Sequence, residues 1–195
     1  MRFDFTFPRE YEIKVLESPP PVHPLEKLYY YPLELEEGDR SGVYVRVAPA
    51  AGTPWFGFFA SGFDSPQVMN AVCSCPDPGA VCVIAGGYAY VVNCSCPSEW
   101  CRVEQRPVME LRTVADQQLT LFAGFTSISA LGPQGLVWNS ERLSWEGLRI
   151  AGIHGHILHG FGWDAPTDKE IAFELDLRTG KHTGGARPPA VSAPR

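Results

Sequence analysis

Two copies of the tetrapeptide Cys-Ser-Cys-Pro carry the residues best suited to chemistry in this chain. One copy contains Cys73 and Cys75, and the other contains Cys94 and Cys96. Four thiolates can hold a zinc ion at about 2.3 Å in a tetrahedral site, and Cys101 supplies a fifth thiol nearby in the sequence. These five cysteines are therefore the candidate metal ligands, and zinc is the candidate metal.

The segment between the two copies predicts how the cysteines are placed. Gly86 and Gly87 stand between two apolar runs, and consecutive glycines supply the positive φ angles of a tight hairpin turn. With the turn at this pair, the hairpin register places Cys94 opposite Gly79. The same register, continued past the hairpin, predicts that the five candidate sulfurs gather at one end and that Cys82 stays apart in mid-strand.

Three interpretations of these cysteines compete. Structural zinc usually uses Cys-x2-Cys, whereas Cys-x-Cys in an extended strand projects both sulfurs to one face without a chelating bend. A redox pair is disfavoured because no Cys-x-x-Cys is present and no feature marks a lowered thiol pKa. The preferred interpretation is that the cysteines are small buried residues, since Cys is among the most buried residue types.

Three histidines form a second group of metal-ligating residue types. His154, His156 and His159 precede Asp164, and imidazole and carboxylate together suit zinc or iron. However, residues 153–157 have the pattern of a hairpin turn between apolar strands, which places His154 and His156 on an exposed tip. Alternation also places His159 on the opposite face from His156. An exposed turn is the favoured interpretation.

The sequence lacks the motifs that identify several classes of function. The motifs of serine hydrolases, zinc proteases, phosphate loops and dinucleotide folds are missing. With 16 basic and 22 acidic residues, the net charge of -6 argues against a nucleic-acid partner. No apolar run approaches the roughly 18 residues of a membrane span, and the N-terminus lacks the features of a secretory leader. These observations predict a cytoplasmic location, where thiols stay reduced, and no membrane partner.

Alternation of apolar and polar residues is the strongest structural pattern in the chain. Strands are expected at 3–7, 11–15, 43–47, 55–60, 81–92 around the Gly-Gly turn, 119–125, 126–131, 148–153, 157–163 and 171–177. The 19 Gly and 18 Pro leave room for one or two short helices at most. We predict an all-β or β-dominated α+β chain, in which an antiparallel meander forms a sandwich-like or open twisted sheet.

Composition divides the chain into four parts. Residues 1–17 are predicted to form an N-terminal β-hairpin, and the proline-rich residues 18–24 to form an extended connector. The main β domain is expected at 25–183. The Pro- and Arg-bearing residues 184–195 have little to bury and are predicted to be a flexible tail.

Aromatic residues are most concentrated at Trp55, Phe56, Phe58 and Phe59. As a functional site, these side chains would anchor a protein partner. As structure, they would form a central strand that is apolar on both faces.

Four segments together carry a resemblance to a known group. Residues 58–62, 83–92, 138–148 and 176–180 resemble an uncharacterised group of bacterial β-rich proteins, over about residues 43–185. The resemblance implies no activity. Residues 175–181 also resemble the outer-strand turn of β-propeller blades, but a single copy favours an open sheet or sandwich over a propeller.

The missing catalytic motifs, the acidic charge and the aromatic segment predict a non-enzymatic protein-binding β module, such as an antidote to a toxin or an accessory subunit. Free sheet edges would also allow a homodimer. One alternative is a metal-binding protein or metal-dependent enzyme that uses the cysteine cluster. The other is a small-molecule-binding module with a pocket lined by Trp55, Phe58 and Trp138.

Overall fold

The computed structural model describes residues 1–21, 26–32 and 41–186, and they form four sheets. Sheet A contains β1 (Arg2–Asp4), β6 (Ala71–Ser74), β7 (Ala80–Ala85), β8 (Tyr88–Asn93) and β9 (Trp100–Arg102). Sheet B contains, in spatial order, β2 (Tyr11–Leu16), β4 (Gly42–Pro49), β5 (Trp55–Ala60) and β3 (Leu28–Tyr31). Sheet C contains β10 (Glu110–Val114), β11 (Leu119–Ala123), β12 (Ile128–Gly132) and β13 (Gly135–Asn139). Sheet D contains β14 (Leu148–His154), β15 (Ile157–Asp164), β16 (Lys169–Asp176) and β17 (His182–Gly184).

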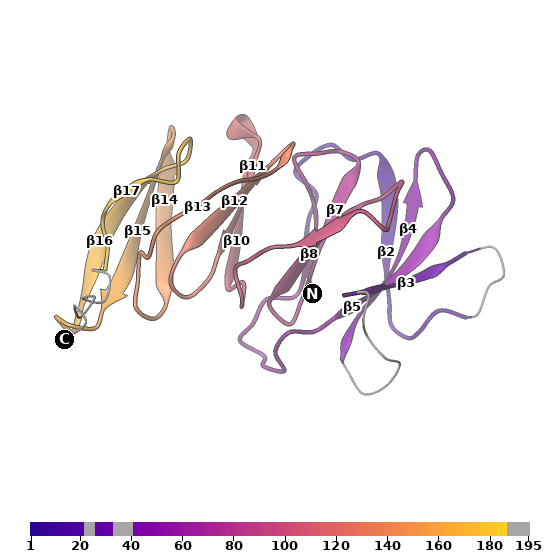
Figure 1. Cartoon of the computed structure of the whole chain (residues 1–195), viewed down its shortest axis with the longest axis horizontal. Helices are drawn as coiled ribbons and strands as arrows, with labels where there is room; N and C mark the ends of the chain where they lie inside the picture. The colour runs from indigo at the N-terminus through magenta and orange to yellow at the C-terminus, as the bar shows by residue number, and fades with distance from the viewer. Residues whose placement is uncertain (22–25, 33–40, 187–195) are drawn as a thin grey trace, which may run out of the picture.

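The four sheets pack face to face in a row, in the order B, A, C, D (Figure 1). Three hydrophobic cores separate them, one between B and A, one between A and C, and one between C and D. Among the described residues the only helical element is the 3-10 turn Ala115–Gln117. The predicted all-β fold, with antiparallel meanders and few short helices, is confirmed.

The position of a sheet in the row explains the residue pattern of its strands. Sheet A lies between two others, so all six residues of β7 are buried: Val83 faces sheet B and Cys82 faces sheet C. Sheet D ends the row. On β16, Phe173 and Leu175 are buried while Glu174 between them is exposed. Continuous apolar runs therefore mark sheets covered on both faces, and alternation marks a sheet with one solvated face.

The Gly-Gly hairpin has the predicted register. Gly86 and Gly87 have φ angles of 53° and 76°, and Ala80 pairs with Asn93 at the far end of the two strands. Cys94 then donates its N–H to the carbonyl of Gly79 at 2.8 Å, as expected from the turn position.

The N-terminal segments 1–17 do not form the expected hairpin. β1 pairs in parallel with β6 in sheet A, whereas β2 pairs with β4 in sheet B. The connection between them is held by other strands, because Phe7 donates its N–H to the hydroxyl of Ser74 and Glu10 to the carbonyl of Pro78. Both strands therefore belong to the body predicted at 25–183.

Two further predicted segments lie partly outside the described residues. Of the proline-rich connector 18–24, residues 18–21 contain no strand. Of the tail 184–195, Gly184 ends β17 and Ala186 is buried, donating its N–H to the carbonyl of Leu143 at 3.0 Å. The chain is thus packed against sheets C and D up to residue 186.

Candidate binding groove

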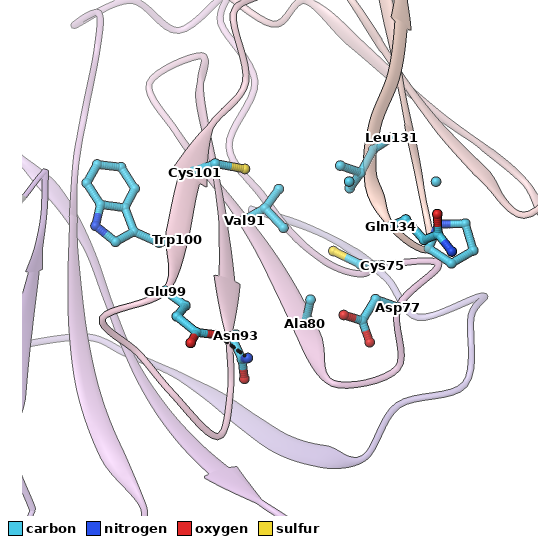
Figure 2. Close-up of a pocket in the computed structure, with 13 residues that line it drawn as sticks. Cys75, Asp77, Ala80, Val91, Asn93, Glu99, Trp100, Cys101, Leu131 and Gln134 are labelled. Carbon is cyan, nitrogen blue, oxygen red and sulfur yellow. Dashed lines mark hydrogen bonds between the residues drawn. The ribbon is translucent and has the colours of Figure 1, made fainter.

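The candidate cysteines lie on both faces of sheet A. Cys75 and Cys101 face sheet C, where both line one cavity (Figure 2). Cys94 is buried on the side of sheet B, and its carbonyl accepts a hydrogen bond from the Trp55 indole at 2.8 Å. Cys96 lies in the turn after β8, with its sulfur 3.4 Å from the hydroxyl of Ser98. The candidate cysteines lie in the half of the hairpin away from the Gly-Gly turn, but they do not share one face of sheet A.

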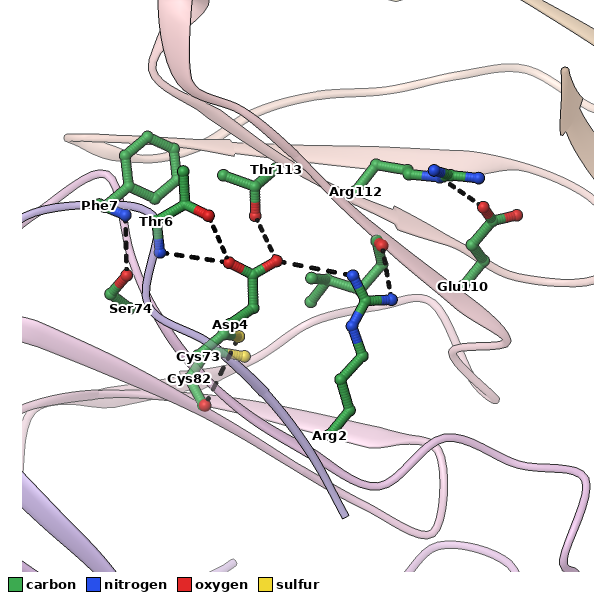
Figure 3. A network of polar contacts seen from close by, with 11 residues as sticks. Arg2, Asp4, Thr6, Phe7, Cys73, Ser74, Cys82, Glu110, Arg112 and Thr113 are labelled. Carbon is green, nitrogen blue, oxygen red and sulfur yellow. Dashed lines mark hydrogen bonds and ion pairs between the residues drawn. The ribbon is translucent and has the colours of Figure 1, made fainter. Parts of the chain in front are cut away.

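The remaining candidate, Cys73, lies directly opposite Cys82 in the pairing of β6 with β7. The thiol of Cys73 donates to the carbonyl of Cys82 at 3.7 Å (Figure 3). Cys82 is therefore not set apart. The predicted separation of Cys82 is wrong because β6 pairs with β7 and places Cys73 directly beside it, while β9 lies on the other side of the hairpin, next to β8.

Four of the thiols have surroundings that raise their pKa. Burial raises the pKa of Cys75 and of Cys101, and the contact with Cys73 together with burial raises that of Cys82. Burial and the nearby carboxylate of Asp77 raise the pKa of Cys94 to about 12. A protonated thiol is a poor nucleophile and a poor metal ligand. Across the described part of the chain, no group of three or more His, Cys, Asp or Glu side chains is arranged to hold one metal ion.

The histidines occupy the predicted turn. Gly155 has a φ angle of 59° at the tip between β14 and β15, and His154 and His156 are exposed beside it. The rings of His154 and His159 lie 5.4 Å apart, and His159 lies 3.5 Å from the carboxylate of Glu174. The carboxylate of Asp164 is buried and accepts a hydrogen bond from Thr167, so it does not face the histidines.

The candidate partner-binding aromatics are buried in the free chain. Trp55 and Phe59 are 2% and 0% exposed in the core between sheets B and A. Phe56 and Phe58 lie on the outer face of sheet B, where the ring of Phe58 contacts Tyr44 at 4.6 Å. This arrangement corresponds to the structural interpretation of a strand that is apolar on both faces. These four side chains therefore offer little surface to a partner.

A groove between sheets A and C offers a surface for a partner. A cavity of about 380 Å³ lies between β9 and the turn joining β12 to β13, and a second of about 180 Å³ adjoins it. Cys101 and Leu131 line both cavities. We call the two together the A–C groove. Its outer rim includes Leu136, whose side chain is 52% exposed.

The groove exists because this face of sheet A carries small side chains. Ala80, Ala89 and the thiols of Cys75 and Cys82 point toward sheet C. Of these, Cys75 and Ala80 line the larger cavity, and their small side chains leave the gap to the turn between β12 and β13 open. Figure 2 shows Leu131 and Gln134 on the wall opposite Cys101 and Val91.

One side of the groove is a free sheet edge. In described sheet A, β9 is the last strand and pairs only with β8. Asn93 donates to the carbonyl of Glu99, and Val103 donates to that of Ala89, both at 2.9 Å. Because backbone groups alternate in direction along an antiparallel strand, the N–H and C=O groups of Trp100 and Arg102 point away from β8.

Three carboxylates lie along the groove without a basic partner. Asp77 and Glu99 line the larger cavity and Glu104 lines the smaller one. Their hydrogen-bond donors are neutral: the N–H of Gly79 for Asp77, and the side-chain amides of Asn93 for Glu99 and Asn139 for Glu104. None of the three forms an ion pair with any residue in the described ranges.

Comparisons with known proteins assign no family. No family model matches the chain, and no curated protein is similar to it in sequence. The resemblance to a bacterial β-rich group stays a prediction. Within the described ranges, the structure has no helix of the length and apolarity that crossing a membrane requires.

The groove residues have few distinguishing features in the sequence. Leu136 and Val137 are adjacent apolar residues just after a Pro-Gln-Gly turn, and both are about half exposed in the structure. Such a pair at the edge of a predicted sheet is a signal that a strand edge is uncovered. Nothing in the sequence alone brings Leu136 next to Cys101.

Proposed function

We propose that this chain is a protein-binding module that holds an extended segment of its partner in the A–C groove. The observation that carries the proposal is the free edge of β9 beside an apolar cavity. An exposed edge is a template for one more strand, and pockets beside such an edge receive alternate side chains of the added segment.

Both parts of the site are needed. β9 has three residues, so main-chain pairing there offers few hydrogen bonds, each contributing about 1 kcal/mol net. The groove adds apolar contact through Leu131, Leu136 and Phe122. A peptide bound to the edge alone would be held weakly, whereas one that also fills the groove would not.

A small-molecule-binding module is the second candidate, and the cavity volume of about 380 Å³ favours it. Small-molecule pockets span about 300–1,000 Å³. The side chains first expected to line such a pocket lie in different cores, Trp55 between sheets B and A and Trp138 between sheets C and D. The small-molecule site would therefore also be the A–C groove.

A matched pair of substitutions tests the proposal. Leu136→Asp places a charge in the groove, whereas Val137→Asp places the same charge on the next residue of β13, which lines neither cavity. Both side chains are about half exposed, so neither change should prevent folding. The tagged chain and each variant would be expressed in the native host and recovered with their bound proteins.

We expect a stoichiometric partner with the wild type and with Val137→Asp, and its loss with Leu136→Asp. Equal recovery by the two variants would place the partner elsewhere, and no stoichiometric partner for any of the three would contradict protein binding. A metabolite that raises the melting temperature of Val137→Asp but not of Leu136→Asp would support the small-molecule function instead. The proposal includes the cytoplasmic location, which predicts six titratable thiols in the freshly purified, denatured chain.

A further inference from the structure

We infer that the segment bound in the A–C groove is a basic and apolar strand, with a Lys or Arg two residues from one apolar side chain and four residues from a second. This inference rests on the proposed function and specifies the chemistry of the partner. It follows from three features of the groove, namely the free backbone groups, the alternation of faces along β9 and the unpaired carboxylates.

The free backbone groups fix the position of the segment. Only Trp100 and Arg102 on β9 point N–H and C=O groups outward, so the segment lies with its centre opposite Cys101. A strand added to an edge continues the pleat of the sheet, so its side chains alternate between the two faces as those of β9 do.

The alternation along β9 then determines which side chains enter the groove. Glu99, Cys101 and Val103 all line the groove, two residues apart on one face of the strand. Trp100 also borders the larger cavity, but its ring lies on the other face and packs against Tyr31 at 5.5 Å. Three side chains of the segment, spaced by two, must therefore face the groove opposite Glu99, Cys101 and Val103.

The chemistry of the groove differs along these three positions. Opposite Glu99, the larger cavity presents the carboxylates of Asp77 and Glu99 at the same end as Asn93 (Figure 2). Opposite Cys101 the wall is Leu131, and opposite Val103 it is Phe122 and Leu136. A basic side chain suits the first position and apolar side chains suit the other two.

Among the described residues, one cation lines the groove, and it forms no ion pair there. Arg102 borders the smaller cavity beside Glu104, and no Lys or Arg of the described chain lines the larger cavity with Asp77 and Glu99. The guanidinium of Arg102 lies over the ring of Tyr88, 5.3 Å from the ring centre, and forms no ion pair within the described ranges. Glu104 adds a third carboxylate at the apolar end. An acidic segment would meet these charges without compensation, so charge complementarity excludes acidic partners and selects basic ones.

Synthetic peptides test this inference directly. Two fluorescent peptides are compared, and the tighter binder is the probe, called the Lys peptide: Lys-Thr-Val-Thr-Leu places Lys opposite Glu99 in parallel pairing with β9, and Leu-Thr-Val-Thr-Lys does so in antiparallel pairing. Threonine favours the extended state in both. One control replaces Lys with Glu. A second control, Lys-Val-Thr-Leu-Thr for the parallel probe or Thr-Leu-Thr-Val-Lys for the antiparallel one, keeps the composition but moves the apolar side chains to the opposite face from Lys. Binding to the full chain is measured by fluorescence anisotropy.

We expect the Lys peptide to bind at least about fivefold more tightly than the Glu peptide at low salt, and this ratio to shrink at about 0.5 M salt, because exposed charges are screened. The shuffled peptide should bind more weakly than the probe at both salt concentrations. The double variant Asp77→Asn, Glu99→Gln should abolish the preference for Lys over Glu, whereas Asp116→Asn, an exposed carboxylate on the 3-10 turn away from the groove, should retain it.

The role of the strand edge is tested by a second pair. Arg102→Pro removes an outward N–H without removing a hydrogen bond to β8, and Arg102→Ala keeps that N–H. Arg102→Pro should bind the Lys peptide about tenfold more weakly than Arg102→Ala. If Arg102→Pro does not fold, the peptide is changed instead. N-methyl groups on both threonines block antiparallel pairing, and N-methyl groups on Val and Leu block parallel pairing, so one of the two peptides must lose binding.

The outcomes separate this inference from the proposed function. Equal binding of the Lys and Glu peptides, abolished for both by Leu136→Asp, would overturn the basic preference and leave protein binding at the groove supported. Failure of all peptides to bind at about 1 mM would overturn the inference, while the capture experiment with Leu136→Asp and Val137→Asp decides the proposed function on its own.

Discussion

The two faces of sheet A are packed in different ways. Toward sheet B the contact is aromatic, and we call this side the aromatic face: Tyr31 and Phe59 of sheet B stack at 4.6 Å, and Tyr90 and Trp100 of sheet A adjoin them. Toward sheet C the face carries alanines and thiols, and the A–C groove remains open beside it. The same strands, β7 and β8, contribute to both faces.

The two faces of sheet A also differ in the hydrogen bonds that buried side chains form with the backbone. On the aromatic face, buried side chains are tied to the backbone by three hydrogen bonds of 2.8 Å, from Trp55 to the carbonyl of Cys94, from Tyr31 to that of Pro97, and from Tyr90 to that of Ala60. On the thiol face, the Cys73 thiol forms a longer contact of 3.7 Å with the carbonyl of Cys82. We therefore expect the aromatic face to contribute most of the stability and the thiol face to provide space for a ligand.

The largest effect is expected from truncating the aromatic face. Phe59 is fully buried between sheets B and A, so Phe59→Ala should lower the free energy of unfolding by about 3–5 kcal/mol through lost burial and a cavity. Urea unfolding followed by tryptophan fluorescence measures the change. A loss below about 1 kcal/mol would mean that this face is not the main source of stability.

Overpacking the two faces sharpens the comparison. Ala85 points into the aromatic core and Ala80 lines the A–C groove, and both are on β7. Ala85→Leu should destabilise by about 1–3 kcal/mol, whereas Ala80→Leu should cost less than about 0.5 kcal/mol because the groove has space for the added carbons. Equal losses in thermal or urea unfolding would show that the groove is not open.

Two tyrosines of the aromatic face form a matched pair for its hydrogen bonds. Tyr31→Phe removes the donor to the carbonyl of Pro97 and should cost about 1–2 kcal/mol, because that buried carbonyl loses its partner. The buried hydroxyl of Tyr11 has no hydrogen-bond partner in the described part of the chain. Tyr11→Phe should therefore leave stability unchanged or raise it slightly. A larger loss for Tyr11→Phe than for Tyr31→Phe in urea unfolding would contradict this assignment.

The smallest effect is expected where β1 ties sheet A to sheet C. Asp4 accepts a hydrogen bond from Thr113 of β10 at 3.1 Å, and Arg2 donates to the carbonyl of Leu111 (Figure 3). Burial opposes ionisation of Asp4, but the hydrogen bonds from Thr6 and Thr113 outweigh it and hold its pKa below the usual value.

A lowered pKa in the folded state gives a definite pH dependence. The contribution of ionised Asp4 is fully present above its unfolded pKa of about 3.9 and is lost as the pH falls through its folded pKa. Asp4→Asn should therefore destabilise the chain by less than about 1 kcal/mol at neutral pH, and this difference from wild type should vanish in strong acid. A difference that stays constant with pH in unfolding titrations would contradict the ionic role.

Much of the fold could be predicted from local patterns in the sequence, because single strands and tight turns depend on neighbouring residues. The bounds of β5 follow from its apolar run, and the register of β7 with β8 follows from the two glycines that set the turn. The pairing between strands that are distant in the chain could not be predicted from these local patterns. Nothing in residues 1–17 shows that β1 pairs with β6 and β2 with β4, since both strands alternate as hairpin strands do.

The candidate site was beyond sequence reasoning for a related reason. Placing the cysteines required knowing on which side of the hairpin β6 and β9 return, and Pro76, Pro78 and Pro97 interrupt the pattern at that point. The groove forms from residues of two sheets, Cys101 from A and Leu131 from C, that are brought together only by the stacking of sheets. Aromatic clustering instead pointed to Trp55 and Phe59, which are core.

The most direct test of the proposed site is the exchange of individual backbone amides on β9, followed by NMR with and without the saturating Lys peptide. In the free chain, the amides of Cys101 and Val103 should be protected by β8, and those of Trp100 and Arg102 should exchange quickly. With the peptide bound, Trp100 and Arg102 should become protected while Cys101 and Val103 change little. Rapid exchange at Trp100 and Arg102 in the bound state would contradict strand addition at this edge.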